Sequence, residues 1–261
     1  MNSKSFTLIT GASGGIGHDL ALIAAAENKN LILVARSLHK LDELAENIRK
    51  NYKSEVITIA VDLSDELGVN KLIAEIESNT LVIDTLINNA GFGDFGDFAK
   101  ANLAKNLEMI RLNISALTQL THFALQGMLK TGSGKIMNVA STAAFMPGPG
   151  MAVYYASKAY VLSFSEALTR ELKGSGVTVT TLCPGPTDTG FAISAGLGKS
   201  LMHRILTAAT PMQVAKAGYK AMLKGKAIEI PGFMNKLSAM SPRFTPRFMV
   251  RNMIYGIHKN H

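Results

Sequence analysis

Short apolar runs alternate with longer helix-like segments along most of the chain, and this alternation constrains the fold more than any other feature. Runs such as Leu31–Ala35 are apolar on both faces of the expected strand, rather than at every second position. Strands of that kind lie in parallel sheets whose two faces are covered by helices. With right-handed crossovers, the pattern predicts a single-domain α/β protein with a Rossmann-type, doubly wound parallel sheet of about seven strands.

The same pattern predicts where each element lies. We expect strands at Phe6–Thr10, Leu31–Ala35, Val56–Val61, Leu81–Asn88, Lys135–Ala140, Val177–Leu182 and Ala227–Ile230. We expect helices at Ile16–Glu27, Leu38–Tyr52, Leu67–Ser78, Leu103–Leu129, Ala152–Lys173 and Pro211–Leu223. Residues 186–210 and 231–246 are expected to be irregular, and the first of these follows the sixth strand, where ligands bind in open α/β sheets. Residues 1–230 are thus expected to form one domain with a substrate loop at about 186–210, and residues 231–261 are expected to extend it.

Cysteine content and hydropathy limit the class of protein. A single cysteine, Cys183, excludes an internal disulfide framework and a cysteine-based zinc site, and we expect no metal. No apolar run approaches the roughly 20 residues that span a bilayer. The N-terminus lacks the basic start and small-residue cleavage site of a signal peptide. These features predict a cytoplasmic protein.

The net charge of +8 is concentrated near the C-terminus. Residues 211–261 carry nine lysines and arginines against one acid, Glu229, whereas residues 1–210 balance. Such asymmetry suggests an anionic partner surface, either membrane or nucleic acid, but a merely solvated basic face is favoured over it. Because no nucleic-acid-binding motif accompanies the charge, we do not expect a nucleic-acid partner.

A basic amphipathic helix is predicted near residue 246. Thr245 is a suitable N-cap with Pro246 in the first turn, and Arg247 and Arg251 then share one face. Phe248 with Tyr255, and Met249 with Met253 and Ile257, supply apolar surface. Such a helix could cover the substrate pocket, pack on a second subunit or lie on an anionic membrane. Pocket or subunit packing is favoured over peripheral membrane contact.

A glycine-rich loop joins the first expected strand to the first expected helix. Glycines permit a tight turn and a close backbone approach to a pyrophosphate, and the helix N-terminus offers free N–H groups to the anion. The position of the loop favours dinucleotide binding over an ordinary turn. The residues that we expect to hold the cofactor here are Gly11, Ser13, Gly14, Gly15, Ile16 and Gly17.

The end of the second expected strand selects the dinucleotide. An acidic residue there would hydrogen-bond the adenosine ribose and select NAD, but this chain has Arg36. A guanidinium can stack on adenine and pair with a 2′-phosphate. The sequence therefore predicts NADP(H) in preference to NAD(H).

Tyr154 and Lys158 are four residues apart at the start of an expected helix, so they share one face, and Ser141 ends the fifth expected strand. A phenol normally titrates near 10, and an adjacent ammonium lowers its pKa toward the range that proton transfer needs. Tyr155 points about 100° away around the helix, so Tyr154 is the expected acid and base.

Together, the glycine loop, Ser141 and the Tyr154–Lys158 pair resemble the short-chain dehydrogenase/reductase family over about residues 5–230. The resemblance implies a catalytic tetrad of Asn113, Ser141, Tyr154 and Lys158. In that tetrad Tyr154 transfers the proton, Ser141 stabilises the oxygen, Lys158 also holds the nicotinamide ribose, and Asn113 positions a water. It implies further cofactor contacts at Asp62, Leu63, Asn89, Ala90, Gly91, Pro184, Gly185, Thr187 and Thr189.

The segments expected around the substrate are rich in Phe and Met, which indicates an apolar carbonyl or alcohol substrate. Packing within the domain is the alternative role for these side chains. The predicted function is an NADP(H)-dependent oxidoreductase, and an NADP(H) sensor or scaffold without turnover is the alternative. The resemblance also implies a homodimer or homotetramer. The expected pocket residues are Phe92, Phe95, Phe145, Met146, Tyr155 and Phe191.

Overall fold

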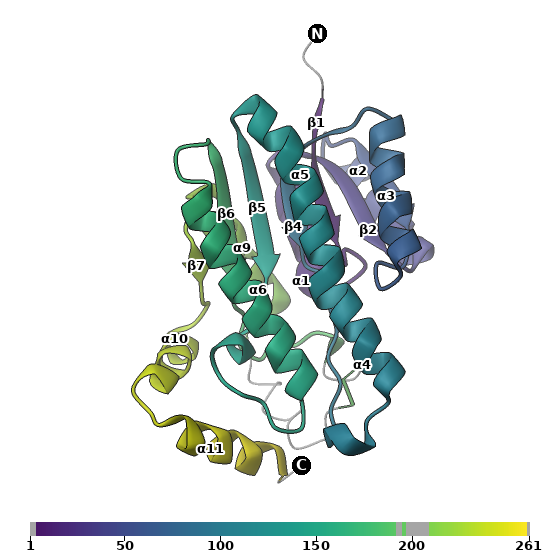
Figure 1. Ribbon diagram of the computed structural model, residues 1–261. Helices are drawn as coiled ribbons and strands as arrows, with labels where there is room; N and C mark the ends of the chain where they lie inside the picture. The colour runs from purple at the N-terminus through teal and green to yellow at the C-terminus, as the bar shows by residue number, and fades with distance from the viewer. Residues whose placement is uncertain (1–3, 192–194, 197–208, 260–261) are drawn as a thin grey trace.

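The computed structural model describes residues 4–191, 195–196 and 209–259. Seven parallel strands form one sheet in the order β3-β2-β1-β4-β5-β6-β7, which confirms the predicted doubly wound fold (Figure 1). The strands are β1 (Ser5–Thr10), β2 (Asn30–Ala35), β3 (Val56–Ala60), β4 (Val82–Asn88), β5 (Gly134–Val139), β6 (Val177–Leu182) and β7 (Ile228–Glu229).

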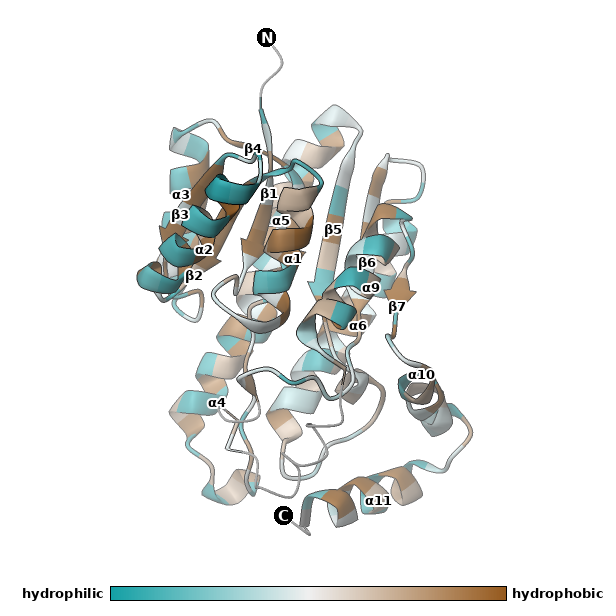
Figure 2. Cartoon of the chain, turned by 180° about the vertical axis from the view of Figure 1, so that it is seen from behind, coloured by the Kyte–Doolittle hydropathy of each residue, from teal (hydrophilic) through white to brown (hydrophobic). Residues whose placement is uncertain are grey.

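Helices cover both faces of the sheet. The helices α1 (Gly15–Ala26), α2 (Leu38–Asn51) and α9 (Pro211–Leu223) bury one face, which Figure 2 shows from behind. The helices α3 (Glu66–Ser78), α5 (Leu117–Thr131) and α6 (Ala152–Glu171) bury the other, with α4 (Leu103–Ile110) leading into α5. Each face has its own apolar cluster, so both surfaces of every central strand are dry, as the apolar runs predict.

Local sequence signals explain several helix ends. Thr210 and Gln213 form a capping box at the start of α9, with Pro211 in its first turn. Asp65 caps α3 by accepting a hydrogen bond from the Leu67 N–H. Gly132 adopts a left-handed conformation and ends α5.

The C-terminal extension is more helical than predicted. Residues 231–246 were expected to be irregular, but α10 (Phe233–Met240) lies within them, followed by a 3-10 turn at Ser241–Arg243. That expectation is wrong because Gly232 and Pro242 mark the two ends of a short helix instead of interrupting one. The expected basic helix is present as α11 (Arg247–Lys259). Among the described residues, no helix has the length and apolar character needed to cross a membrane.

Candidate active site

Ser141, Tyr154 and Lys158 lie together beyond the carboxyl end of β5. Tyr154 and Lys158 occupy the first turns of α6, and Lys158 Nζ is 5.9 Å from the centre of the Tyr154 ring. The side chain of Ser141, which follows β5, hydrogen-bonds the side chain of Tyr154. Ser141 Oγ also accepts a hydrogen bond of 3.1 Å from the Ala143 N–H, which fixes the hydroxyl beside the phenol.

Loss of water dominates the electrostatics of this group. Tyr154 is partly exposed as a whole residue, yet burial of its phenol raises the pKa of Tyr154 to about 12, against a smaller lowering by Ser141. Burial lowers the pKa of Lys158 to about 8, and its ammonium donates a hydrogen bond of 2.9 Å to the Val139 carbonyl. Desolvation of the phenol thus outweighs the lowering expected from Lys158, whose ammonium is directed at the backbone, and the role of Lys158 in tuning Tyr154 stays a prediction.

Asn113 lies in a π-helical segment, Arg111–Ala116, between α4 and α5. Its amide donates hydrogen bonds to the Phe92 carbonyl and to Ser157 Oγ, both at 3.0 Å, and accepts one from the Phe92 N–H. Ser157 Oγ in turn donates to the Tyr154 carbonyl at 2.7 Å. Asn113 thus ties the segment after β4 to the helix turn that carries Tyr154, and single π-turns of this kind are common at functional sites.

The glycine loop after β1 is open toward a ligand and tightly packed behind it. A Cβ on Gly17 would lie 2.3 Å from the Gly11 carbonyl oxygen, whereas one on Gly14 would meet nothing within 4 Å. Gly11 and Gly15 adopt positive φ angles of 66° and 55°. No side chain caps the N-terminus of α1, which leaves its first N–H groups without a side-chain acceptor there. Uncapped N–H groups beside an open backbone fit a pyrophosphate.

Residues at the end of β4 hold this loop in place. Thr10 Oγ1 accepts hydrogen bonds of 3.0 Å from the N–H groups of Asn89 and Ala90. The Asn89 amide donates to the carbonyls of Thr10 and Gly11 at 3.0 and 3.1 Å. Gly91, the next residue, lies against Asn113 and Lys158, where a Cβ would come within 3.0 and 3.4 Å of their polar atoms. The predicted segment from residue 89 to 91 therefore links the glycine loop to the catalytic residues.

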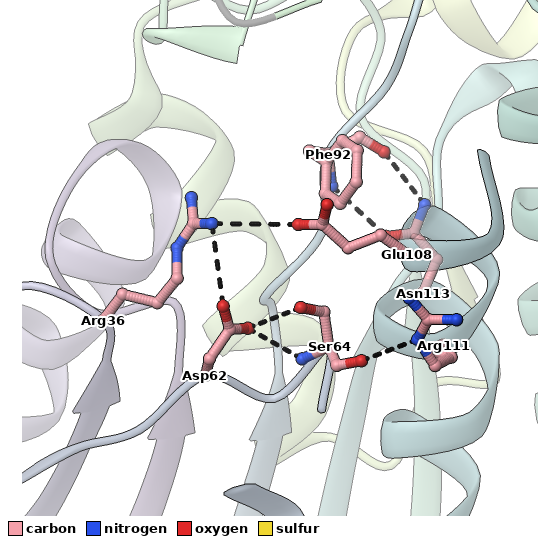
Figure 3. Close-up of polar contacts among 7 residues, drawn as sticks. All are labelled: Arg36, Asp62, Ser64, Phe92, Glu108, Arg111 and Asn113. Atoms are coloured by element: carbon pink, nitrogen blue, oxygen red, sulfur yellow. Dashed lines mark hydrogen bonds and ion pairs between the residues drawn. The ribbon is translucent and has the colours of Figure 1, made fainter. Parts of the chain in front are cut away.

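Arg36 extends from the end of β2 beside two carboxylates, as Figure 3 shows. Its guanidinium is 3.9 Å from both Asp62 and Glu108, and its side chain is 72% exposed. Burial acts to raise the pKa of Asp62, but hydrogen bonds from Ser64 and the charge of Arg36 lower it overall. The adjacent Leu63 is buried in the core. Arg36 is thus held loosely at the sheet edge, with its hydrogen-bond donors accessible.

The segment that follows β6 packs against the glycine loop. Thr189 packs on Gly15, and the two residues border a cavity of about 390 Å³ together with His18, Asp19 and Asp188. The Pro184 carbonyl accepts a hydrogen bond of 2.8 Å from the Thr142 N–H, next to Ser141. Thr187 Oγ1 donates to the Gly185 carbonyl at 2.9 Å. The rest of the predicted substrate loop, residues 192–194 and 197–208, lies outside the described residues.

Two of the predicted substrate-pocket side chains, Phe191 and Tyr155, pack against the Tyr154 ring, and Tyr155 does so edge-on with ring centres 6.1 Å apart. The Phe191 ring centre is 5.1 Å from that of Tyr154, and the same ring closes over Gly93. Phe92 is tied through its backbone to Asn113, and Phe95 packs edge-on against His258 at 5.8 Å. Phe191 therefore borders the reacting centre, while Phe95 lies beside the C-terminal helix.

Tyr155 and the remaining two predicted pocket residues line a larger cavity between α6 and the C-terminal extension. This cavity, of about 620 Å³, is mostly apolar, with Arg243, Arg247 and Arg251 on the side of the extension. Phe145 also packs against the cluster around Val161, so the alternative of packing within the domain applies to it. The residues predicted from sequence in this lining are Phe145, Met146 and Tyr155.

Sequence reasoning missed three residues that organise the site. His258 donates a hydrogen bond from Nδ1 to the Pro149 carbonyl and lies 3.5 Å from the Tyr155 hydroxyl. Asn235 of α10 packs on Gly185 so closely that a Cβ there would lie 2.4 Å from its side chain. Ser157 could have been found, because it faces the same side of α6 as Tyr154 within the motif. Nothing local to His258 or Asn235 predicts these long-range contacts.

Comparison with known proteins agrees with this geometry. The family model described as short chain dehydrogenase matches residues 5–200. The chain belongs to the short-chain dehydrogenase family. It is therefore an oxidoreductase that acts on alcohol and carbonyl groups with a nicotinamide cofactor, and the glycine cradle fits that cofactor.

Three members of the family show how far the similarity extends. The chain is 34% identical to the ketoacyl reductase HetN of Nostoc sp., over 85% of this chain and 76% of that protein. It is 36% identical to sulfoacetaldehyde reductase 2 of Chromohalobacter salexigens, over 80% of this chain and 84% of that protein. The structure of a short-chain dehydrogenase from Sphingobium yanoikuyae in complex with NADPH superposes with a TM-score of 0.81, at 29% identity, covering 92% of this chain and 93% of that one.

Proposed function

We propose that this short-chain dehydrogenase is an NADP(H)-dependent carbonyl reductase, reversible to the alcohol, for an apolar substrate. The observation that carries the proposal is the hydrogen-bonded Ser141–Tyr154 pair with Lys158 beneath it and Phe191 packed on the phenol. Bound NADPH would supply the hydride. The remaining chemistry, which is proton delivery and stabilisation of the substrate oxygen, belongs to side chains of this chain.

Tyr154 acts as the general acid in this proposal. With its pKa raised to about 12, the phenol is fully protonated at neutral pH and can donate to a carbonyl oxygen that gains negative charge. Ser141 donates to the same oxygen, because its hydroxyl is held next to the phenol. The reverse reaction requires loss of the phenolic proton.

Asn113 and Lys158 are assigned supporting roles. Lys158 is fixed to the Val139 carbonyl and would hold the nicotinamide ribose when the cofactor is bound. Both N–H groups of the Asn113 amide are used within the protein, so its side chain serves to position Phe92 and Ser157. Its predicted water relay would therefore depend on groups other than these two N–H donors.

The preference for NADP(H) rests on Arg36. Its exposed guanidinium ends β2, where an acid would select NAD, and its pairs with Asp62 and Glu108 are too long for strong hydrogen bonds. The NADPH bound to the Sphingobium yanoikuyae relative supports the same choice.

The apolar substrate rests on the side chains around the site. Phe191 borders Tyr154, and the cavity beside α6 is mostly apolar. A ketoacyl substrate, as the name of the Nostoc relative indicates for that protein, has the required carbonyl and apolar chain. We also propose a homo-oligomer formed through α4–α5 and α6, as the family resemblance implies.

The experiment that tests this function joins cofactor binding to turnover. On titration with the protein, the fluorescence of NADPH should change as the cofactor binds. Oxidation of NADPH should be observed with apolar ketones and β-ketoacyl thioesters. Binding of NADPH without turnover across a broad panel of such carbonyl compounds would instead favour the sensor or scaffold role.

A further inference from the structure

The outer surface of α10, the following turn and α11 is unusually apolar, and we call it the tail face. Its large side chains include Phe233, Phe244 and Phe248, which are 79%, 82% and 59% exposed. Met234, Met249 and Met253 are each at least 51% exposed on the same segment. Single exposed apolar residues are ordinary, but a group of this size on adjoining elements marks an interaction surface.

The orientation of α11 leaves this surface without a partner among the described residues. Val250, Ile254 and His258 point toward the domain and are buried. A helix that only covers a domain carries polar residues on its outer side. Here the outer side carries Phe248, Met249 and Met253 instead, and Figure 2 shows apolar colour along the helix.

The tail face lies at the end of the molecule that holds the active site. In Figure 1, α11 lies below the carboxyl ends of the strands, where the catalytic residues are found. His258 connects α11 directly to this end, through its hydrogen bond to Pro149 and its ring contacts with Phe95 and Tyr155. Whatever covers the tail face therefore lies beside the substrate segments.

Charge identifies the covering partner. The extension that carries the tail face also carries the exposed cations Lys236, Arg243, Arg247 and Arg251, of which the three arginines border the cavity beside that face, and no acidic residue occurs after Glu229. A two-fold contact between copies through this face would place like positive charges against one another. An anionic surface that also accepts Phe and Met side chains satisfies both properties, and the surface of a bilayer with acidic lipids has both.

We propose that the tail face binds the surface of an anionic lipid bilayer and holds the mouth of the active site against it. The helices lie on the membrane and do not cross it, with the phenylalanines and methionines inserted and the cations at the level of the headgroups. This arrangement would let an apolar carbonyl substrate pass from the lipid phase to Tyr154, a step that rests on the proposed function.

Vesicle flotation of the full chain tests the proposal. The protein should float with phosphatidylcholine vesicles that contain about one-third phosphatidylglycerol, and far less with pure phosphatidylcholine. Raising the salt to about 0.5 M should weaken binding several-fold, because the charges at the headgroups are then screened. Failure of the full chain to float with anionic vesicles would overturn the proposal without depending on any variant.

A variant with Phe248→Ser, Met249→Ser and Met253→Ser should lose at least tenfold in vesicle affinity. The matched control replaces Leu38, Leu67 and Leu223, which are exposed far from the tail face, by serine and should bind as the unmodified chain does. Equal flotation of the two variants would contradict the role of the apolar side chains. Circular dichroism checks that both fold, and turnover of a water-soluble ketone should be the same in both.

The other possible occupants give different results. If the unmodified chain does not float and the tail variant differs from it in mass in solution, the tail face is a contact between subunits. Retention on soluble polyglutamate without vesicle binding would assign it to an acidic protein. Because flotation needs no turnover, absence of NADPH oxidation would count against the proposed function and leave the membrane proposal standing.

Discussion

At the scale of single residues, the site is governed by removal of water from two ionisable groups. Burial pushes the pKa of Tyr154 up to about 12 and that of Lys158 down to about 8, so each neutral form is favoured. The phenol therefore stays protonated well above neutral pH, while the ammonium of Lys158 is the group that titrates at about 8. Proton delivery from Tyr154 is available without prior ionisation.

This order of titration predicts the pH dependence of carbonyl reduction. Lys158 is charged below its pKa of about 8, so kcat/KM should be level at lower pH and fall up to about tenfold per unit above that value. The profile should be measured between about pH 6 and 10, with circular dichroism to exclude unfolding. A rate that rises or stays level across this range would show that the charge on Lys158 is not required.

Arg36 gives a second prediction at this scale. Arg36→Ala should raise KM for NADPH about tenfold or more, because charge-assisted hydrogen bonds to a phosphate are lost, and leave KM for NADH nearly unchanged. Lys50→Ala, an exposed cation at the end of α2, is the matched control and should alter neither value. Equal losses with both cofactors would mean that Arg36 does not read the 2′-phosphate.

At the scale of elements, two short irregular segments set the geometry. The glycine loop places the uncapped N-terminus of α1 beside an open backbone, and the π-turn at Asn113 pins the segment after β4 to α6. The glycine loop follows the carboxyl end of β1, and Asn113 binds the segment that follows the neighbouring strand β4. The parallel sheet brings these ends to one edge, and the irregular segments then fix the side chains there.

Two glycines of the loop should respond differently to the same substitution. Gly17→Ala puts a methyl group 2.3 Å from the Gly11 carbonyl oxygen, so it should lower the free energy of unfolding by about 1–3 kcal/mol and weaken NADPH binding. Gly14→Ala meets open space and should leave stability almost unchanged. Thermal and urea unfolding measure the difference, and equal stability of the two variants would contradict the packing seen behind the loop.

The elements also show what a single sequence can predict. The predicted strand ends lie within about two residues of the observed ones, because consecutive apolar positions indicate that a strand is buried on both faces. The motif residues could be predicted because they lie at fixed spacings along the sequence. The π-turn, the contact of Asn235 with Gly185 and the position of His258 were not found, since each depends on residues far apart in sequence. The short α10 was missed because its flanking glycine and proline resemble a loop.

At the scale of the whole molecule, the C-terminal extension closes the end of the domain that holds the active site. Asn235 packs on Gly185, beside the predicted nicotinamide segment, and His258 reaches Pro149 beyond the catalytic serine. The extension also forms one wall of the 620 Å³ cavity that contains Tyr155. The domain and its extension therefore act as one unit, in which α11 supports the apolar side of the site.

His258→Ala tests this support. Loss of the hydrogen bond to Pro149 and of the packing on Phe95 should lower the free energy of unfolding by about 1–2 kcal/mol and raise KM for the carbonyl substrate several-fold. The dissociation constant of NADPH should not change. His39→Ala, at an exposed position on α2, is the control. An unchanged KM together with unchanged stability would show that α11 does not support the site.

The most direct measurement is turnover by Tyr154→Phe beside Tyr155→Phe. Each variant loses one hydroxyl from adjacent positions of α6, but only Tyr154 hydrogen-bonds Ser141. We predict that Tyr154→Phe binds NADPH normally and loses carbonyl reduction by about a hundredfold or more, the usual contribution of a general acid, while Tyr155→Phe keeps most of it. Near wild-type reduction by Tyr154→Phe on a confirmed substrate would contradict its assignment as the proton donor.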